Sequence, residues 1–436
     1  MDATTSHLLS PGLQGPGLKR IMWSSIIGTA VEWYDFLIYA TATALVFNKL
    51  FFPVASDPAL ATIVSFGTYG VGFFARPVGA AVFGHFGDRV GRKAMLAATI
   101  AIMGVGTFLI GLLPTYSQIG IAAPVLLVVL RLLQGIGLGG EWGGAVLMVV
   151  ESAPTRHRGL LGSMVQIGNP IGNLAAIGMF AAVSQLPEAS FLAWGWRIPF
   201  LISIMLVGVG LWIRLTLEET PTFRALQARQ QVSTLPIAEV FGASRKPFLI
   251  AVGLKISEIA WASIAGVFVL SYGTTTLGLT RTALLNDLLV ANVIALGAIP
   301  LFGHLSDRVG RKTMCYLSCT FAILFAFPLF ALLNTRDPFT VGAAIVAGIT
   351  FGQMIMFGIG APWYSELFPA RLRYSGASLG FQIGAALSGG LSPLIAAALI
   401  FKFGTTWPIS VFLILCASIT LTAAIAAPET ARREID

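Results

Sequence analysis

The sequence is poor in charge. Its 27 Lys and Arg and 19 Asp and Glu residues make up only 11% of the 436 positions, against about 25% in soluble globular domains. A soluble protein of this length could not cover its core with so few charges, so the composition excludes a soluble fold.

Cysteine is also scarce. Cys315, Cys319 and Cys416 all lie inside apolar runs, without CxxC spacing and without a partner histidine. This pattern indicates neither a disulfide framework nor a metal site. The chain also lacks HExxH and GxSxG motifs, so an enzyme is not indicated. We expect no cofactor and no bound metal.

Long apolar runs dominate what is present. Mean hydropathy is +0.84 and 56% of residues are apolar, and a membrane-spanning helix needs about 20 mostly apolar residues. The twelve apolar segments lie near 21–47, 60–84, 94–114, 121–150, 159–184, 197–213, 248–272, 284–304, 313–333, 339–364, 375–401 and 406–427. The sequence therefore predicts an all-α membrane protein with twelve transmembrane helices.

A polar stretch separates two sets of six segments. We expect a tail at 1–20, a six-helix bundle at 21–213, a helical linker at 214–246, a second bundle at 247–428 and a tail at 429–436. Placing the N-terminus in the cytoplasm assigns 19 of the 27 Lys and Arg residues to cytoplasmic segments. The positive-inside rule then predicts that both termini are cytoplasmic. The net charge of +8 is thus attributed to topology and not to nucleic-acid binding.

The two halves repeat one another. Residues 84–95, GHFGDRVGRKAM, recur as residues 303–314, GHLSDRVGRKTM, with nine of twelve positions identical. Each copy joins the second and third helix of its half. Residues 151–158 and 366–373 likewise correspond between the fourth and fifth helices. Two parallel six-helix repeats predict a solute site near the middle of the membrane at their interface.

These motifs resemble a known family. The repeated loop G-x-x-x-D-R-x-G-R-K and residues 131–135, RLLQG, are similar to the signatures of the major facilitator superfamily. Residues 32–36, 75–79, 139–144 and 195–199 resemble its metabolite:proton symporter family, whose members import organic acids, proline, betaine or related metabolites. Residues 131–154 are most similar to the shikimate transporter branch. The resemblance covers the whole chain.

Ionisable groups inside a bilayer are costly and indicate function. Glu32 and Asp35 lie three residues apart near the middle of the first helix, on nearly one face. We expect Asp35, and with less support Glu32, to bind the coupled proton, with Arg131 on the fourth helix as counter-ion. The resemblance implies the same arrangement. The alternative is a permanent ion pair that only holds helices together.

Four further charged residues lie within predicted helices. Arg76 presents a planar fork suited to a carboxylate, or it anchors a helix end. Glu141 lies among glycines, where a hydrogen-bonded strut is favoured over a proton site. Lys255 and Glu258 either pair with each other or contribute to substrate binding and gating.

A small hydroxylated solute also needs neutral partners. Polar and aromatic side chains in the predicted spans are the candidates for these contacts. They are Trp33, Tyr34, Gln166, Asn169, Asn173, Trp261, Gln353 and Gln382. Packing or interface anchoring is the alternative for each.

The repeated loops are expected to latch the cytoplasmic side, because carboxylates there can meet helix N-termini and arginines of the other half. The candidates are Asp88, Arg89, Arg92, Lys93, Glu151, Asp307, Arg308, Arg311, Lys312 and Glu366. Topology alone is the alternative. Glycines at 168 and 172, and at 376, 380 and 384, predict helices that approach neighbours closely.

The sequence thus predicts a monomeric inner-membrane transporter that imports a small organic anion, such as a shikimate-like hydroxy acid, together with a proton. Three alternatives use the same fold: uptake of a zwitterion such as proline or betaine, uptake of a dicarboxylate such as 2-oxoglutarate, and export of a drug or metabolite. A membrane enzyme or a channel is disfavoured.

Overall fold

The computed structural model describes most of the chain. The described residues are 16–52, 58–90, 92–140, 146, 149–150, 153–216, 240–242, 244–369, 373–431 and 433. For residues 16–21, 24, 58–62, 84–90, 92–96, 213–216 and 374 only the backbone is described. Most of the expected linker at 214–246, and part of each expected tail, lies outside the described residues.

Six long helical segments make up the first half of the chain. They are α1 (Pro16–Ala42), which continues through η2 (Thr43–Phe47) and α2 (Asn48–Leu50), α3 (Pro58–Val90), α4 (Arg92–Leu112), α6 (Ala122–Gly139), α8 (Arg158–Gln166) with α9 (Gly168–Val183), and α11 (Ile198–Thr216). Short helices connect them: α5 (Tyr116–Ile119), η3 (Thr155–His157), α10 (Glu188–Ala193) and η4 (Gly195–Arg197).

Six more segments make up the second half. They are α14 (Arg245–Ser263) with η5 (Ile264–Phe268) and α15 (Val269–Thr275), α16 (Arg281–Val309), α17 (Arg311–Leu333), α18 (Pro338–Ala347) with η6 (Gly348–Met354) and α19 (Ile355–Glu366), α20 (Arg373–Ala385) with η8 (Ala386–Gly390) and α21 (Ser392–Phe403), and α22 (Trp407–Ala426). The described residues contain no strand.

The helices are apolar enough to cross a membrane. Among the described residues, eight helices are both long enough and apolar enough to span a bilayer, with mean hydropathies from 1.6 to 2.4. Together with the segments formed by α1, α3, α4 and α8–α9 they give the twelve predicted from the sequence. The all-α membrane fold is therefore confirmed.

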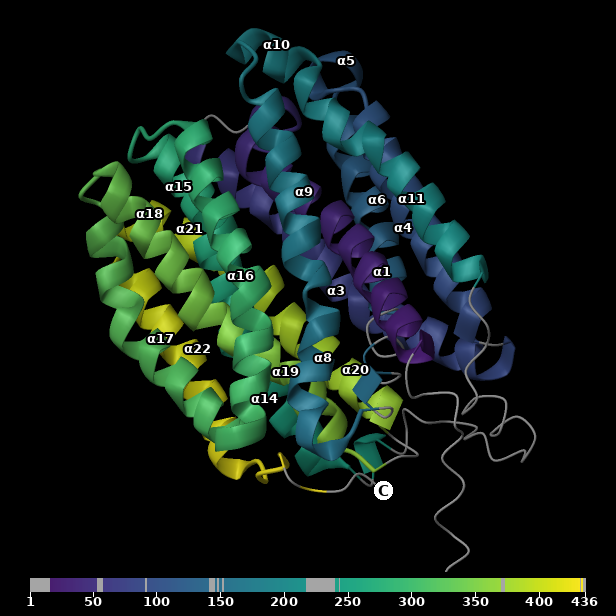
Figure 1. The fold of residues 1–436 in the computed structure, drawn as a ribbon. Helices are drawn as coiled ribbons and strands as arrows, with labels where there is room; N and C mark the ends of the chain where they lie inside the picture. Colours follow the sequence, from purple (N-terminus) through teal and green to yellow (C-terminus); the bar gives the residue numbers. More distant parts are fainter. Residues whose placement is uncertain are drawn as a thin grey trace, which may run out of the picture.

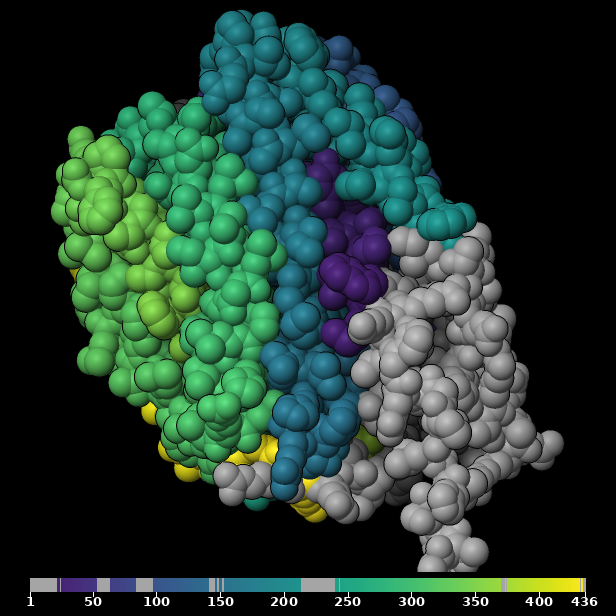
Figure 2. Space-filling view, in the orientation of Figure 1, coloured from purple at the N-terminus to yellow at the C-terminus, as the bar shows by residue number. Residues whose placement is uncertain are grey.

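The two groups of helices meet along two seams. One seam brings α8 and α9 against α16, and the other brings α3 against α20, η8 and α21. Figure 1 shows the first group on the right and most of the second on the left, with α10 and the C-terminus at opposite ends of the bundle. Figure 2 shows α16, in green, lying directly beside α8 and α9, in blue.

Local signals in the sequence set several helix ends. Thr280 accepts a hydrogen bond from the backbone N–H of Ala283 and so caps α16, and Asp337 accepts one from Thr340 and caps α18, with Pro338 as the first residue of that helix. Gly310, between α16 and α17, has a φ of 99°, which only glycine adopts without strain. The repeated loop therefore needs its glycine for the turn.

Glycines allow the close helix contacts that the sequence predicts. A Cβ at Gly168 or Gly172 on α9 would come within 2.6 Å of a backbone oxygen of α1, and one at Gly380 or Gly384 on α20 within 2.7 Å of a side chain on α14. Thus α9 packs on α1, and α20 packs on α14. These are the equivalent contacts of the two repeats, and each lies within its own half.

One of the tightest approaches between two helix backbones gives a stability prediction. A Cβ at Gly79 on α3 would lie 1.9 Å from the carbonyl oxygen of Ile136 on α6, so Gly79→Ala must force the helices apart. Overpacking of this kind costs about 1–3 kcal/mol. We expect a lower midpoint of thermal unfolding for purified Gly79→Ala in detergent.

Gly67 on the same helix is the matched control, because nothing lies within 4 Å of a Cβ placed there. Gly67→Ala should leave the midpoint unchanged or raise it slightly, since alanine favours a helix by roughly 0.5–1 kcal/mol over glycine. Equal midpoints for the two variants would contradict the assigned contact.

Candidate functional site

A cavity lies between the two groups of helices. It has about 630 Å³ of empty space, part of which is open to solvent, and it is lined by α1, α3 and α9 from the first half and by α14, η5, α16 and η6 from the second. Its polar and aromatic lining residues are Trp33, Phe36, Thr41, Tyr69, Asn169, Asn173, Ser263, Asn292 and Gln353. No lining residue is charged. The cavity suits a small molecule that forms hydrogen bonds and ring contacts.

Four helical elements of the second half line this cavity: α14, η5, α16 and η6. Two of them depart from α-helical geometry. Both η5 and η6 are π-helical, and Val267, Gln353 and Met354 from these segments face the cavity. Insertions of π-helix occur frequently at functional sites. A single-sequence pattern of apolar residues does not reveal them.

Three asparagine amides form one side of the cavity. Asn173 Nδ2 donates to Asn292 Oδ1 at 2.8 Å and to Asn169 Oδ1 at 3.3 Å. Asn292 Nδ2 donates to the carbonyl of Leu288 in its own helix, at 2.8 Å. The sequence predicts Asn169 and Asn173 as site residues but misses Asn292, whose only signal is a polar residue in the middle of an apolar helix.

Two guanidinium groups lie next to this cavity. Arg76 Cζ is 4.3 Å from the ring centre of Phe36 and 4.1 Å from that of Phe73, and Arg131 Cζ is 4.0 Å from that of Tyr39. Phe36 lines both the central cavity and a small pocket that Arg76 and Arg131 line. Cation–π contacts of this kind favour desolvated arginines.

Glycine makes room for one of these arginines. A Cβ at Gly72 on α3 would lie 2.4 Å from Arg131 Nε, so a larger residue would displace the guanidinium. Four nitrogens, Nε and Nη2 of both Arg76 and Arg131, are buried without a hydrogen-bond partner among the described residues. Each arginine can therefore donate further bonds to an anion.

The expected ion pair between Asp35 and Arg131 is not formed. Both residues line the small pocket, but neither oxygen of Asp35 has a hydrogen-bond partner among the described residues, and the side chain is completely buried. Arg131 Nη1 donates instead to Gln134 Oε1 at 3.3 Å, and Gln134 Nε2 donates to Thr107 Oγ1 at 2.7 Å. The aromatic faces hold the guanidinium in place of a carboxylate.

Gln134 is a site residue that the sequence interpretation missed. It belongs to the quoted RLLQG motif and lies three residues after Arg131, hence on the same helix face. This spacing is the signal that could have identified it. Thr107 offers no comparable signal, because hydroxyl residues are common within membrane helices.

Three more charged residues are buried within the transmembrane helices: Glu32, Lys255 and Glu258. Glu32 interacts electrostatically with Arg76. Lys255 pairs with Glu258, and both side chains are completely buried. Lys255 Nζ also lies 3.8 Å from the ring centre of Phe381. The pairing of Lys255 with Glu258 is one of the two outcomes expected from the sequence, and neither residue lines the cavity.

Four predicted solute contacts lie away from the cavity. The Tyr34 hydroxyl donates to the carbonyl of Pro199 at 2.8 Å and so ties α1 to α11. Trp261 packs against Phe321 and Phe325 inside the second half. Gln166 and Gln382 are buried but do not line the cavity. Position along a helix does not determine which face turns to the interface, so a role of these four residues in solute binding stays a prediction.

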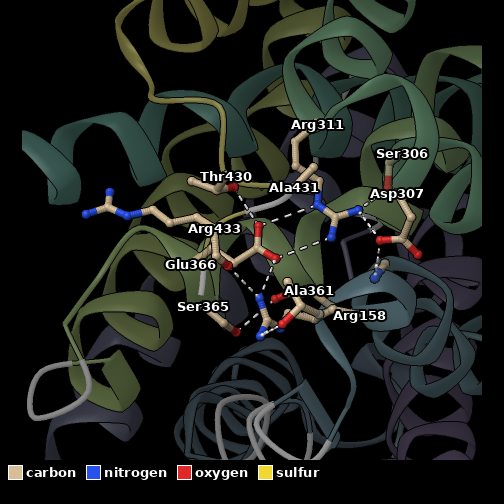
Figure 3. A network of polar contacts seen from close by, with 12 residues as sticks. Arg158, Ser306, Asp307, Arg311, Ala361, Ser365, Glu366, Thr430, Ala431 and Arg433 are labelled. Carbon is tan, nitrogen blue, oxygen red and sulfur yellow. Dashed lines mark hydrogen bonds and ion pairs between the residues drawn. The ribbon is translucent and has the colours of Figure 1, made fainter. Parts of the chain in front are cut away.

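A network of ion pairs joins the two halves at the end of the bundle where the C-terminus lies; we call this the network end (Figure 3). Asp307 accepts hydrogen bonds from the backbone N–H groups of Gly159 and Leu160 at 2.8 and 3.0 Å, at the N-terminus of α8. Arg311 lies 3.0 Å from Asp307 and 3.3 Å from Glu366. The expected contact between a carboxylate and a helix N-terminus of the other half is therefore present.

Other members of the repeated loops have different positions. Arg308 is exposed, and Lys312 Nζ donates to the carbonyls of Ile425 and Ala427 at the end of α22. These two residues therefore do not join the network. The side chains of Asp88, Arg89, Arg92, Lys93, Glu141 and Glu151 lie outside the described residues.

The opposite end of the bundle, the far end, is bridged by Glu188. This carboxylate lies 2.8 Å from Lys49 and 2.7 Å from Arg281, and Arg281 belongs to the other half. The hydrogen bond from Lys49 and the positive charges of Lys49 and Arg281 hold the pKa of Glu188 below its ordinary value. The carboxylate therefore stays ionised in mild acid.

Nothing in the described part of the chain is arranged to hold a metal ion, since no three His, Cys, Asp or Glu side chains come together there. Cys315, Cys319 and Cys416 are buried free thiols.

Curated relatives match nearly the whole chain. It is 41% identical over 392 residues to the shikimate transporter of Escherichia coli K12, covering 89% of each protein. It is 40% identical over 425 residues to the inner membrane metabolite transport protein YhjE of the same organism, covering 96% of each. It is 33% identical to that organism's proline/betaine transporter, over 96% of this chain and 85% of the relative.

The fold has close counterparts among solved structures. A crystal structure of the D-xylose–proton symporter superposes with a TM-score of 0.71 at 19% identity, covering 95% of this chain and 98% of the other. The model of the family described as "Sugar (and other) transporter" matches residues 21–242 and 224–436. The resemblance found in the motifs is thereby confirmed: the chain is a transporter and not an enzyme, and it belongs to the Sugar (and other) transporter family within the major facilitator superfamily.

Proposed function

We propose that the protein is a proton-coupled symporter that imports a small organic anion by alternating access. The observation that carries this proposal is a set of six buried charges beside an uncharged cavity. Three are carboxylates and three are cations: Glu32, Asp35, Glu258, Arg76, Arg131 and Lys255. All six are less than 10% exposed.

Charge balance links the proton to the anion. With all six groups ionised, this set is neutral, and a bilayer interior tolerates a neutral set far better than a net charge. One proton on a carboxylate leaves a net charge of +1, which a monoanionic solute cancels. Proton and solute therefore stabilise each other's binding, as symport requires.

Asp35 is the proposed coupling acid. Its oxygens have no hydrogen-bond partner among the described residues, and desolvation favours the neutral form of a carboxyl group. Asp35 also lines the small pocket with Arg76 and Arg131, so a movement that brings a guanidinium group to the carboxylate would favour the ionised form. Glu32, which interacts with Arg76, is the second candidate.

Arg76 and Arg131 are proposed to attract the solute carboxylate. Their four unpartnered nitrogens suit a planar anion, and the ring of Phe36 separates them from the central cavity. A shift of this ring would bring the solute carboxylate to the guanidinium groups. The uncharged cavity would then hold the remainder of the solute.

The energetics favour a monocarboxylate. A monoanion that enters with one proton moves no net charge, whereas each uncompensated charge changes the free energy of transport by about 2.3 kcal/mol per 100 mV. A dicarboxylate such as 2-oxoglutarate with one proton would be opposed by an inside-negative potential. The 41% identity to a protein named shikimate transporter supports a shikimate-like hydroxy acid as the solute.

Uptake of a zwitterion is the second candidate function. It is favoured by the 33% identity to the proline/betaine transporter and by an uncharged cavity. A zwitterion leaves the protonated site with a net charge, however, and its cationic group would meet no charged residue in the cavity lining. We therefore place the organic acid first, and drug or metabolite export below both.

Alternating access is proposed to use the two ends in turn. At the network end, the hydrogen bonds from α8 to Asp307 and the ion pair between Arg158 and Glu366 join the halves. At the far end, Glu188 and Arg281 join them. We place the network end and both termini in the cytoplasm, because most Lys and Arg residues of the loops fall on that side. The names of the relatives support a bacterial inner membrane, and we propose a monomer.

Asp35→Asn tests proton coupling. Asparagine keeps the shape of the side chain but cannot take up and release a proton, so labelled shikimate should no longer accumulate above its external concentration in proteoliposomes with an acidic exterior. Counterflow between two pools of shikimate should persist, because exchange needs no net proton movement. Glu32→Gln is the comparison variant, and normal accumulation by Asp35→Asn would remove Asp35 as the coupling acid.

Arg76→Lys tests recognition of the carboxylate. Lysine keeps the charge but loses the planar fork, so the affinity for shikimate should fall roughly ten- to hundredfold, as expected when a charge-assisted hydrogen bond of about 1.5–3 kcal/mol is lost. Competition by the uncharged methyl ester of shikimate should change little, because the ester lacks the carboxylate. Equal losses for both compounds would assign Arg76 to structure.

Asp307→Asn tests the network end. The variant weakens the contact with α8 and with Arg311, so the population should shift towards the state open at this end and uptake should slow several-fold. The affinity for shikimate should stay within about twofold, because Asp307 lies away from the cavity. Asp287→Asn, on the same helix but outside the network, is the control. A large loss of affinity at an unchanged rate would contradict the latch.

A further inference from the structure

The asparagine cluster has hydrogen-bonding capacity that the protein leaves unused. Asn169 Nδ2 and Asn173 Oδ1 are buried in the cavity wall and have no partner among the described residues. One is a donor and the other an acceptor. Buried polar atoms are normally satisfied, so an unpaired donor and acceptor on adjacent turns of one helix indicate a ligand.

The chemistry of these atoms selects among ligands. A hydroxyl group both donates and accepts, so it can satisfy an amide N–H and an amide carbonyl at once. A carboxylate only accepts, and it would face the carbonyl oxygens of Asn173 and Asn292 without a positive charge to offset the repulsion. A methyl or ring C–H group would leave both amide atoms unpaired. The cluster therefore matches hydroxyl groups best.

The position of Asn292 is fixed by its own helix. Its Nδ2 donates to the carbonyl of Leu288, so its Oδ1 points across the interface to Asn173 Nδ2, 2.8 Å away. A solute hydroxyl inserted between the two amides would accept from Asn173 and donate to Asn292. One direct hydrogen bond between the halves would thus be replaced by two bonds through the solute.

We propose that Asn169, Asn173 and Asn292 form a hydroxyl-binding subsite that selects hydroxylated carboxylates over analogues without hydroxyl groups. This subsite rests on the proposed function in one respect: it requires that Arg76 and Arg131 bind the solute carboxylate on the other side of the Phe36 ring. The asparagine amides contact the part of the solute that lies opposite its carboxylate. The solute class is thus an acid whose hydroxyl groups lie across a ring or short chain from its carboxylate.

The subsite also connects recognition with movement. Asn173 lies on α9 and Asn292 on α16, the helices that form one seam between the halves. A hydroxylated solute replaces their direct contact, whereas an unhydroxylated acid of the same size leaves it in place. Discrimination should therefore appear in the transport rate as well as in affinity.

The test compares ligand pairs that differ only in hydroxyl groups. Shikimate and cyclohex-1-ene-1-carboxylate form an acidic pair, and 4-hydroxyproline and proline form a zwitterionic pair. Binding to purified full-length protein is measured by thermal shift and by competition in proteoliposomes. Wild type should prefer shikimate over the unhydroxylated acid roughly tenfold, the effect of two neutral hydrogen bonds. Asn173→Ala and Asn292→Ala should abolish that preference through loss of shikimate binding alone.

Asn286→Ala is the matched control, since Asn286 lies on the same helix but is exposed outside the cavity; its preference should equal that of wild type. Asn292→Ser keeps a small polar group and replaces the alanine variant if that one does not fold. The absence of any preference in both wild-type pairs, or an equal loss of both acids in the variants, would overturn the subsite. A preference confined to the zwitterionic pair, with no binding of either acid, would uphold the subsite and overturn the proposed anion transport.

Discussion

The site depends on how the interior of the bilayer accommodates two guanidinium groups. Arg76 and Arg131 lie against the rings of Phe36, Phe73 and Tyr39, and contacts of this kind contribute about 2 kcal/mol or more when desolvated. That is far less than the free energy needed to bury an isolated charge. Carboxylates must therefore lie nearby, and the region as a whole must stay close to neutral. Under this constraint a proton or an anion that entered alone would leave a net charge, so the proposed symport would follow from electrostatics without a dedicated relay.

The same constraint explains why the cavity itself is uncharged. A charge exposed in the cavity wall would bind the solute in both orientations of the transporter and slow its release, whereas the amide and hydroxyl side chains at Thr41, Asn173, Ser263 and Gln353 exchange readily with water. The charges instead lie behind Phe36, a residue that belongs to both the cavity and the small pocket. A solute that moves this ring would change the surroundings of the titratable groups. Protonation of those groups would in turn change how the ring and the solute are held.

The sequence predicted the helices well and their faces less well. Twelve apolar runs and a duplicated loop determine the architecture, because spans of about 20 apolar residues allow few alternatives. Individual contacts were harder to predict. Trp33 and Asn173 line the cavity as expected, whereas the hydroxyl of Tyr34, the residue after Trp33, donates to the carbonyl of Pro199. Successive helix residues are rotated by about 100°, and hydropathy does not report rotation when every face is apolar. The expected pair between Asp35 and Arg131 is absent for another reason, since aromatic faces take the place of a carboxylate beside Arg131.

The far end and the middle of the protein are expected to respond differently to pH. Glu188 has a lowered pKa, caused first by its hydrogen bond from Lys49. A depressed carboxyl pKa means that the bridge to Arg281 is fully present above the ordinary pKa of about 4.5 and is lost only as the pH falls through the lowered value. This end therefore closes equally well on the acidic and the neutral side of a membrane. Because the bridge at the far end persists in mild acid, the proposed proton coupling depends on the buried carboxylates instead. Closure of the far end and proton coupling are thus proposed to use different residues, so that each could be altered without the other.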